Sequence, residues 1–502
     1  MSMIPKDDSI FTTKSELIKV STQRQLFLDD HCVGTMDGLE RRLQQPTKCG
    51  PVLRPESEKG QIALSCRSVP QWNPEKNLWE WWYWGSWECE PRGPYQNTSF
   101  SLTHYAVSED GVHWEKPNLG LFEWQGCREN NVAVEPGEGD QSLYHIIRDE
   151  DEPDPGKRYK GLFGTRNRKL MVSPDGFDWS PVDVAEIPSN DESHFFKDES
   201  TGRYVALVKR DTVWGRSVFL ETSRDFIEWE NHGVVVHADQ VDWDNRAERI
   251  RRVVEDSRYV SPPLVDEENH IAEIYQMAAM PYEGIYIGFV GVFNPAGAIP
   301  PPQMNHTGLN QVELAMSRNL LHWRRLCDRE LFLTVEPWDG EVYETHQALL
   351  CGRPIVRDDE IWIYYNAGRF RGHKELYPEK YHPWFKDITA MSLAKLKRDR
   401  FVSLCAKEEG QLLTNRLLLE GKDLYVNVDA DSGELRAEIL NAETMKPLQG
   451  RSFENSMSIT ESSIRCNLTW SSESGGSKSL ERVPVRIRFN LRNAKLYSFW
   501  TE

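Results

Sequence analysis

Long apolar runs are missing from this chain of 502 residues, whose mean hydropathy is −0.61. A membrane-spanning helix needs about 20 consecutive apolar residues, so the sequence excludes a transmembrane span and a membrane partner. Residues 1–20 also lack the uninterrupted apolar stretch of a secretory signal, because acids and lysines interrupt them. We therefore expect residues 1–20 to be an N-terminal tail and the protein to be cytoplasmic.

Basic residues are too few to balance the acidic ones. Sixty Lys and Arg against 78 Asp and Glu give a formal net charge of −18. Nucleic-acid binding depends on neutralising phosphates with Lys and Arg, so we expect no nucleic-acid partner. The nine cysteines are scattered, and no Cys-x-x-Cys or Cys/His ligand spacing occurs. That pattern favours free thiols over a disulfide framework or a zinc site.

The familiar motifs of several enzyme classes are absent as well. The sequence contains no GxSxG elbow, phosphate-binding P-loop, HExxH zinc motif or GxGxxG dinucleotide fingerprint. His104, with Ser101 and Ser108 near it in sequence, has no context that supports a hydrolase triad. We therefore expect any chemistry here to use neither a metal ion nor an organic cofactor.

What the chain does contain is a phrase that recurs along its length. Its copies are YAVSEDGVHW (105–114), LMVSPDGFDW (170–179), LETSRDFIEW (220–229) and LAMSRNLLHW (314–323), with a weaker echo at 390–401. Each copy joins an apolar strand to a polar turn and then to an aromatic residue. Ser and Asp side chains commonly bond backbone groups in such turns. We expect that structural role for Ser108, Asp110, Ser173, Asp175, Ser223 and Asp225.

Two further strands precede each copy. Roughly alternating β-branched and aromatic residues predict a first strand at 62–69, 142–149, 193–198, 273–280 and 343–350. The same pattern predicts a second strand at 79–84, 158–164, 203–210, 284–293 and 360–368. Four-stranded units repeated in this way form a β-propeller. Because two sets of strands match in all five repeats, a long β-sandwich or unrelated meanders are the weaker alternative.

The expected fold is therefore all-β, with a five-bladed β-propeller over residues 21–405 and a β-sandwich over residues 408–502. Residues 24–33 would pair into the last blade and close the ring. Residues 408–502 predict the sandwich because alternating strands are separated there by Gly and Asp turns. The sandwich would either brace the propeller or bind sugar itself.

Long connections between the second and third strands identify the face that would carry function. They cover residues 85–104, 294–311 and 366–387, and long loops on one side of a rigid scaffold commonly carry binding sites. The first strand of each unit opens onto this face near the propeller axis. Acids stand there in every unit: Glu58, Asp140, Asp191 with Glu192, Glu273, and Asp339 with Glu341 and Glu344.

Converging carboxylates would have a chemical use. Crowding raises the pKa of one carboxyl group while another stays ionised. Cleavage of a glycosidic bond needs that combination, an acid for the leaving oxygen and a base or nucleophile opposite it. The candidate catalytic residues are Asp191, Glu273 and Asp339, with Glu58 and Glu344 in reserve. Taken alone, each acid would more often be a solvated loop residue.

Aromatic and basic residues surround these acids in the sequence. The chain holds 18 Trp, and a flat ring can stack on the apolar face of a sugar. Arg and His can hold hydroxyls or an anionic group, and His306, His373 and His382 lie on the same loops. The candidate substrate-binding residues are Trp87, Arg168, Arg210, Trp214, His346, Arg369 and Trp384. Individually, each also fits a packing or surface role.

Several stretches resemble a known group of proteins. LFLDDHCV, GPVLRPE, EIYQMAAMPYEGIYIGF, ELAMSRNLLHW and VPVRIRFNLRNAKLYSFW, with the first repeat, resemble bacterial glycoside-hydrolase-like proteins. That group is related to the five-bladed propeller glycosidases of families 32, 43 and 62, and the resemblance covers nearly the whole chain. It implies three carboxylates on the inner strands of successive blades, acting as base or nucleophile, pKa modulator and general acid.

The chain also departs from those families. It lacks the WMNDPNG-like and RDP motifs of family 32, so fructan specificity is not implied. No Glu-Cys dipeptide stands on a predicted inner strand, and Glu88-Cys89 falls in a predicted blade loop.

The leading hypothesis is a glycoside hydrolase that acts at the chain end of a carbohydrate. A glycoside phosphorylase is one alternative, for which Arg168, Arg210 and Arg369 could supply an anion site. A non-catalytic carbohydrate-binding propeller is the other. The sequence leaves open the sugar, its anomer and linkage, the stereochemical outcome and the oligomeric state.

Overall fold

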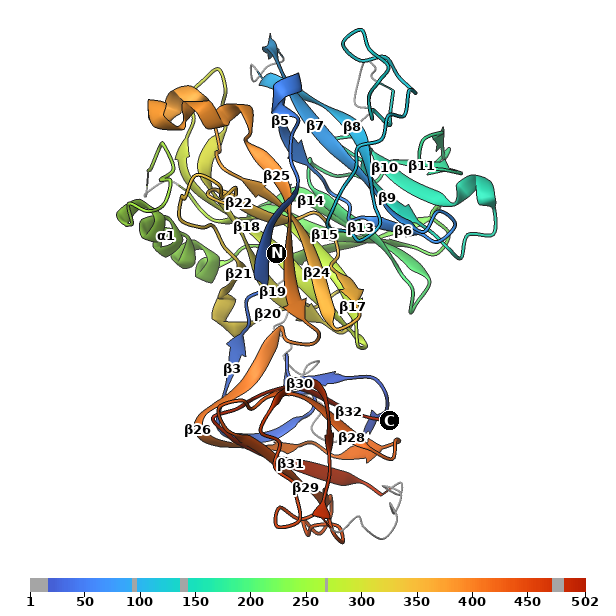
Figure 1. Cartoon of the computed structure of the whole chain (residues 1–502), viewed down its shortest axis with the longest axis vertical. Helices are drawn as coiled ribbons and strands as arrows, with labels where there is room; N and C mark the ends of the chain where they lie inside the picture. Colours follow the sequence, from blue (N-terminus) through green and yellow to red (C-terminus); the bar gives the residue numbers. More distant parts are fainter. Residues whose placement is uncertain (1–16, 93–96, 136–142, 267–269, 472–482) are drawn as a thin grey trace.

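The computed structural model describes residues 17–92, 97–135, 143–266, 270–471 and 483–502. Asp140, one of the candidate acids, lies outside these residues. The described chain is mostly β-structure, and its one α-helix is α1 (Gln240–Glu255). Figure 1 shows a larger body above and a smaller one below, with β3 and β26 running between them. No helix in the described ranges is both long and apolar enough to cross a membrane.

The larger body is built from antiparallel units, five of them in the described residues. Two are separate four-stranded sheets, ordered β9–β10–β11–β12 and β13–β14–β15–β16. Their strands are β9 (Leu143–Arg148), β10 (Tyr159–Phe163), β11 (Lys169–Ser173), β12 (Ser180–Pro181), β13 (Ser193–Asp198), β14 (Arg203–Thr212), β15 (Gly215–Ser223) and β16 (Trp229–Val236).

The other three units share one 14-stranded sheet. Single parallel pairings join them, Asn310 with Gln347 and Thr389 with Ala63. One unit holds β5 (Gln61–Ser65), β6 (Gln71–Asn73), β7 (Leu78–Arg92) and β8 (Asn97–Ser108). The next holds β17 (Glu273–Tyr282), β18 (Ile285–Ala298), β19 (His306–Ser317), β20 (Arg324–Arg325) and β21 (Leu331–Leu333). The last holds β22 (Gln347–Leu350), β23 (Ile355–Arg357), β24 (Glu360–Gly368), β25 (Thr389–Lys397) and β4 (Thr47–Leu53).

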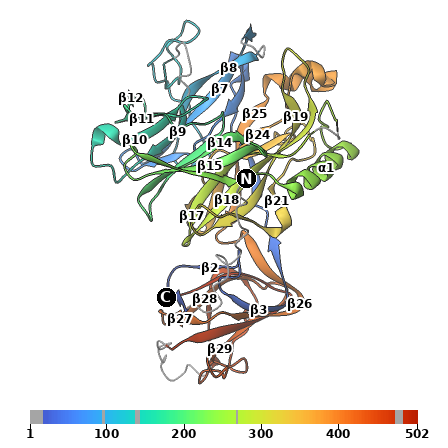
Figure 2. The ribbon, with the colours of Figure 1, turned by 180° about the vertical axis from the view of Figure 1, so that it is seen from behind.

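Each of the predicted first and second strands overlaps a strand of the structure, so these predictions are confirmed. The loop prediction is partly wrong, because β7 with β8 and β18 with β19 continue as hairpins far into 85–104 and 294–311. Hydrogen-bonded strands satisfy the backbone groups that a loop would leave to water. Glu88 and Cys89 accordingly lie in β7. Figure 2 shows β14, β15, β17 and β18 at the centre of the larger body, seen from behind.

The segment 24–33 does not close a ring of blades, so that prediction is wrong. β2 (Gln25–Leu26) pairs with β32, and β3 (Val33–Leu43) pairs with β26, whereas β4 is the strand that pairs with β25. The reason is that the segment alternates between two cores. Leu26 and Leu28 pack into the core of the larger body, while Phe27 and Cys32 pack into that of the smaller body.

The smaller body is a 10-stranded sheet with its own apolar core. Residues 18–43 supply its first three strands, and the rest come from the C-terminal part of the chain. The strands not yet placed are β1 (Ile18–Val20), β26 (Val402–Thr414), β27 (Leu417–Leu419), β28 (Leu424–Asp429), β29 (Glu434–Asn441), β30 (Ser462–Leu468), β31 (Val485–Arg492) and β32 (Lys495–Thr501). A propeller over 21–405 and a sandwich over 408–502 stay predictions.

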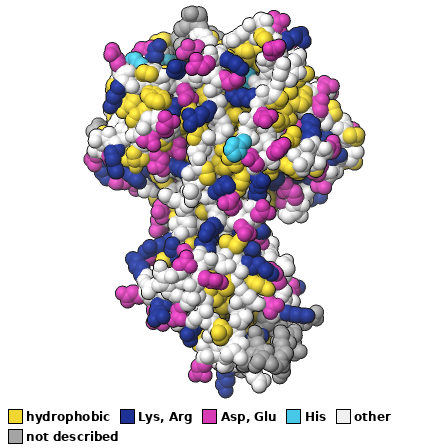
Figure 3. Space-filling model, viewed as in Figure 1, with side chains coloured by type: hydrophobic (Ala, Val, Ile, Leu, Met, Phe, Trp, Pro, Cys, Tyr) yellow, Lys and Arg dark blue, Asp and Glu magenta, His cyan; other side chains and the backbone are white. Residues whose placement is uncertain are grey.

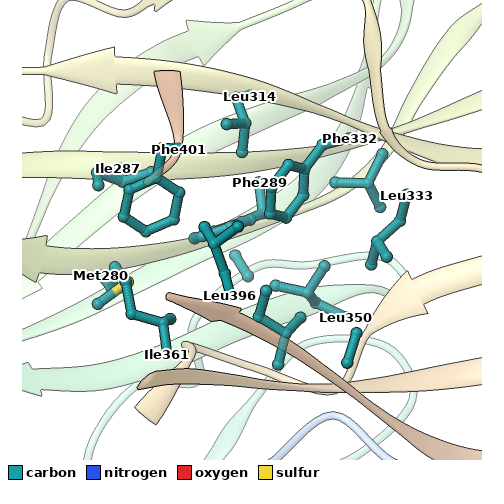
Figure 4. Close-up of a cluster of buried hydrophobic side chains, with 14 of the residues drawn as sticks. Met280, Ile287, Phe289, Leu314, Phe332, Leu333, Leu350, Ile361, Leu396 and Phe401 are labelled. Atoms are coloured by element: carbon teal, nitrogen blue, oxygen red, sulfur yellow. The ribbon is translucent and has the colours of Figure 1, made fainter. Parts of the chain in front are cut away.

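The largest core cluster lies between β17–β19 and β22–β25. Figure 4 shows the tilted rings of Phe289 and Phe332 packed together, with Phe401 close by. Burying apolar side chains of this size contributes roughly 1.5–3 kcal/mol each. The cluster therefore fixes β17, which carries Glu273, and β22, which directly follows His346. On the face seen in Figure 3, acidic and basic side chains are interspersed over both bodies.

The recurring Ser-Asp turns have the structural role that the sequence predicted. Asp110 Oδ1 accepts from the backbone N–H groups of Val112 and His113, both at 2.8 Å. Ser108 Oγ accepts from the Gly111 N–H at 2.8 Å. The second and third copies repeat the Asp bonds at 2.9 Å, from Asp175 to Phe177 and Asp178 and from Asp225 to Ile227 and Glu228. In every copy the closing Trp Nε1 donates to the carbonyl three residues earlier.

Helix α1 was not foreseen from the sequence. It begins after Asp239, whose side chain accepts from the Val241 N–H at 2.9 Å, while Asp242 accepts from the Asp239 N–H. This reciprocal arrangement is a capping box, and the D-x-x-D spacing in the sequence could have revealed it. The cysteines of the described residues form no disulfide bond with one another.

Candidate functional site

Eight side chains from four of the five units come together around the starts of the inner strands β13 and β17. Arg67 follows β5, Asp191 and Glu192 precede β13, and Lys209 and Arg216 belong to β14 and β15. Glu273 and Tyr275 begin β17, and Arg371 follows β24. We call this group the inner-strand cluster: Arg67, Asp191, Glu192, Lys209, Arg216, Glu273, Tyr275 and Arg371.

Arg67 and Glu192 form the most enclosed ion pair of the cluster. Arg67 Nη2 donates to Glu192 Oε1 at 2.6 Å, and Nε donates to Oε2. The two side chains are 10% and 3% exposed. Burial alone would lower the pKa of Arg67, but the Glu192 carboxylate raises it well above its usual value. Arg67 therefore stays charged, and the fork fixes the backbone just before β13.

Asp191 points outward from the same position. Its Oδ1 lies 2.5 Å from Lys209 Nζ, and its side chain is 57% exposed while that of Lys209 is 2% exposed. Burial acts to raise the pKa of Asp191, but Lys209, Arg216 and Arg67 outweigh it and lower the pKa. The expectation that crowded acids raise one another's pKa is therefore wrong for Asp191. Cations surround it, so it is ionised at neutral pH.

Glu273 opens β17 against the tip of the β14–β15 hairpin. Its Oε1 accepts from the Arg216 backbone N–H at 3.1 Å, and its Oε2 lies 3.5 Å from Arg216 Nη1. Gly215 makes this approach possible, because a Cβ there would lie 2.6 Å from Glu273 Oε1 and the residue has φ +77°. The Glu273 side chain is 22% exposed, so one end of it remains open to a ligand.

Tyr275 carries cations over its ring. Lys209 Nζ lies 4.3 Å from the ring centroid, and the Arg216 and Arg371 guanidinium carbons each lie 5.6 Å from it. A cation over an aromatic face is attracted by the ring quadrupole. The ring thus gathers positive charge next to Asp191 and Glu273.

The remaining candidate acids lie elsewhere. Asp339, Glu341 and Glu344 line a separate groove of about 700 Å³, together with Lys48 and Arg54. Asp339 Oδ1 accepts from the backbone N–H groups of Glu341 and Val342 at 2.8 and 2.7 Å, an arrangement typical of a turn residue. Glu344 is buried and accepts from Tyr365 Oη at 2.7 Å.

Glu58 is exposed in a 3₁₀ turn, Ser57–Lys59. The described acids that the sequence placed in register, Glu58, Asp191, Glu273 and Asp339, therefore do not form one group. Among the described residues, only Asp191, Glu192 and Glu273 of that set share partners in the inner-strand cluster.

Three candidate binding residues are buried and hold the backbone in place. Arg168 donates to Ser193 Oγ and to the carbonyls of Gly164 and Asn190. Arg369 pairs with Asp387 at 2.8 Å and stacks 3.7 Å from the Tyr343 ring centroid. Burial lowers the pKa of His346 to about 4, so that His346 is neutral.

The other candidates differ in how open they are. Arg210 pairs with Glu221 and donates to the Pro188 carbonyl at 2.7 Å. Trp87 is buried against Trp124, and partly buried Trp384 packs edge-on against Trp338. Trp214 is partly exposed at the tip of the β14–β15 hairpin and stacks on His237 with ring centroids 4.1 Å apart. Of these four, Arg210 follows Lys209 directly and Trp214 lies two residues before Arg216, so both neighbour the inner-strand cluster in sequence.

Sequence reasoning missed the cations of the cluster. Lys209 and Arg210 are neighbours on β14, and alternation along the strand sends them to opposite faces. Arg210 was the candidate, yet Lys209 is the residue that meets Asp191. Arg67, Arg216 and Arg371 stand at or near strand ends that the pattern did identify. Their place at or near the end of a predicted strand was the only available signal for them.

Comparisons with known proteins give little more. The sequence matches no protein family model, and no curated protein matches it. Solved structures that resemble it include one titled "Glycoside hydrolase", with 11% identity and a TM-score of 0.41 over 70% of this chain and 92% of the other.

Two further resemblances are of the same order. An N-acetylgalactosamine deacetylase from F. plautii has 12% identity and a TM-score of 0.39, over 72% and 97% of the two chains. A GH32 beta-fructofuranosidase from Bombyx mori has 10% identity and a TM-score of 0.36, over 92% and 93%. Resemblances this weak decide neither the reaction nor the substrate. Both must therefore be inferred from the side chains described above.

Proposed function

We propose that the protein is a glycoside hydrolase that cleaves terminal glycosidic bonds of an oligo- or polysaccharide. The five antiparallel units would be the blades of a five-bladed β-propeller, and the smaller body a β-sandwich that braces it. The observation that carries the proposal is that Asp191 and Glu273, at the starts of neighbouring inner strands, contact Lys209 and Arg216, two cations over the same Tyr275 ring. The resemblance of the sequence to glycoside-hydrolase-like proteins supports it.

The two carboxyl groups suit different roles. The lowered pKa of Asp191 keeps it ionised, which fits a base or nucleophile. Glycosidic cleavage needs a second carboxyl group to protonate the leaving oxygen. Glu273 is the member of the cluster left for that role, because its Oε2 contacts Arg216 only at 3.5 Å. Glu192 has both oxygens held by Arg67, so we assign it a positioning role.

Trp214 would provide the sugar platform. Its ring is partly exposed beside Gly215, the residue that contacts Glu273, and His237 supports it from behind. Neighbouring Val213 is 90% exposed, so the hairpin tip projects into solvent. A sugar ring can stack its apolar face on an exposed aromatic ring of this kind.

The test is a panel of aryl glycosides and oligosaccharides, assayed with the purified full chain. On a substrate that the parent cleaves, Asp191→Asn and Glu273→Gln should each lower kcat by about 10²–10⁴-fold, the usual contribution of general acid–base catalysis. Asp339→Asn and Asp175→Asn are matched controls, because both carboxylates serve turns, and they should keep normal kinetics. Full activity in both cluster variants would show that the site is wrong.

Two alternatives give different results in the same assay. A glycoside phosphorylase would release a sugar phosphate and depend on phosphate for turnover. A non-catalytic carbohydrate-binding protein would bind members of the panel and turn over none of them at any pH tested.

A further inference from the structure

Positive charge in the inner-strand cluster exceeds what its carboxylates neutralise. Arg67 is paired with Glu192 and Lys209 with Asp191. That leaves Arg216 and Arg371 to share Glu273. Arg216 reaches Glu273 only at 3.5 Å, and within the described ranges no ion pair joins Arg371 to a carboxylate. Such an excess stands out in a chain whose formal net charge is −18.

Both arginines contact the same two aromatic rings. The guanidinium carbons of Arg216 and Arg371 lie 5.7 and 4.2 Å from the Phe293 ring centroid, in addition to their contacts with Tyr275. Arg371 Nε donates to the His306 carbonyl at 2.8 Å, and this bond orients the guanidinium group. Both terminal nitrogens of Arg371 then remain for a ligand. These side chains are therefore positioned before any ligand arrives.

The Arg216 nitrogen that faces Glu273 is only partly used. This Nη1 lies 3.5 Å from Glu273 Oε2, is buried and makes no hydrogen bond in the described structure, although 28% of the side chain is exposed. Buried donors without partners are unfavourable, and a charged one especially so. His306, beside the pair, has a pKa lowered by burial first and then by His270, Arg216 and Arg371. Its titration thus responds to the same positive field.

We infer that Arg216 and Arg371 form a subsite for an oxyanion beside Glu273. Planar guanidinium groups recognise carboxylate and phosphate through paired hydrogen bonds. Two sources share this chemistry: a carboxylate on the sugar itself, as in a uronic acid, and free inorganic phosphate. The assignment of this anion to the reaction rests on the proposed function, but its binding does not.

Each source has a defined consequence. A sugar carboxylate would be held in place while water attacks the anomeric carbon. With phosphate, a phosphate oxygen would form the new bond to the anomeric carbon as the glycosidic C–O bond breaks. Glu273 would then give its proton to the leaving oxygen, and the products would be a sugar 1-phosphate and the shortened carbohydrate.

Ligand-induced change in Tm is the primary measurement, made on the full chain without any turnover. Sodium phosphate, sodium glucuronate and neutral glucose are titrated at constant ionic strength. We expect phosphate or glucuronate to raise the Tm and glucose not to, since a ligand that binds the folded state stabilises it. If phosphate raises the Tm more, the natural ligand of the subsite is the free anion. If glucuronate raises it more, the natural ligand is the carboxylate of a sugar.

Variants connect this binding to the two arginines. Arg216→Met and Arg371→Met should each weaken anion binding at least 10-fold, and Arg371→Lys should weaken it less because it keeps the charge. Arg492→Met removes an exposed arginine of the smaller body and should change nothing. The inference is overturned if neither anion stabilises the parent, or if both Met variants fold and bind like it. Anion binding without turnover would instead refute only the proposed function.

Discussion

The Ser-Asp turns and the inner-strand cluster both depend on carboxylates, but they use them in opposite ways. Asp110 holds backbone N–H groups two and three residues away, and the arrangement recurs in four turns. Glu192 holds Arg67, 125 residues away, and among the described residues no other unit repeats that pair. Local, repeated bonds serve folding in every unit. A long-range bond that occurs once, such as the Arg67–Glu192 pair, makes one unit of a repetitive fold different from the others. Function is expected at such a place.

The largest effect should come from breaking the buried pair of the cluster. Glu192→Gln leaves the Arg67 charge without its partner at 10% exposure, which typically costs about 3–5 kcal/mol of stability. Arg67→Met combined with Glu192→Leu removes both charges and should recover much of that loss. Urea denaturation of the three proteins measures this. If Glu192→Gln loses less than about 1 kcal/mol, the pair is not as enclosed as described.

A turn glycine should give the next largest effect. Gly176 in the second repeat has φ +85°, and a Cβ there would lie 2.4 Å from the Trp82 ring. Gly176→Ala should therefore combine left-handed strain of about 1–2 kcal/mol with a steric clash. Gly202→Ala is the matched control, because Gly202 has φ +69° and open space around it.

The difference between these two variants isolates the clash. Thermal or urea unfolding should show Gly176→Ala to be clearly the less stable of the two. Equal losses in both would mean that Trp82 moves aside freely.

The contrast between turns and cluster also explains what the sequence could reveal. Alternating residues predicted the strands, and the Ser-Asp spacing predicted the turns, because each pattern acts over a few residues. The contact of Arg216 with Glu273 joins positions 57 residues apart and depends on how two units pack. Asp191 and Glu273 were found through their place before an inner strand. Asp339 occupied an equivalent place in sequence, yet its turn bonds point it into another groove.

Removing a turn carboxylate should affect folding and leave turnover unchanged. Asp110→Ala loses the bonds to Val112, His113 and Ser108, and loss of such a side-chain bond typically costs about 0.5–1.5 kcal/mol net. The Tm should fall while folded protein keeps normal kinetics on any substrate found. An Asp110→Ala protein with unchanged Tm and no activity would reverse the roles of the turns and the cluster.

The smallest effect concerns charge alone in a turn. Asp225 has its pKa lowered by hydrogen bonds from the Glu228 and Ile227 N–H groups, against a smaller opposing effect of burial. A carboxyl group with a lower pKa in the folded state adds stability above its unfolded pKa, about 3.9. That contribution is lost as the pH falls below this value. Asp225→Asn keeps the acceptor oxygen without the titration, and Asn319 already forms the fourth turn in this way.

Because Asp225 is exposed, the change at neutral pH should stay within about 0.5 kcal/mol. The Tm of the parent should fall more steeply than that of Asp225→Asn between about pH 5 and pH 3, since only the parent loses the carboxylate at this position. All other carboxyl groups are common to both proteins, so the difference between the two Tm curves belongs to Asp225. Parallel curves would mean that the turn depends on the acceptor oxygen and gains nothing from its charge.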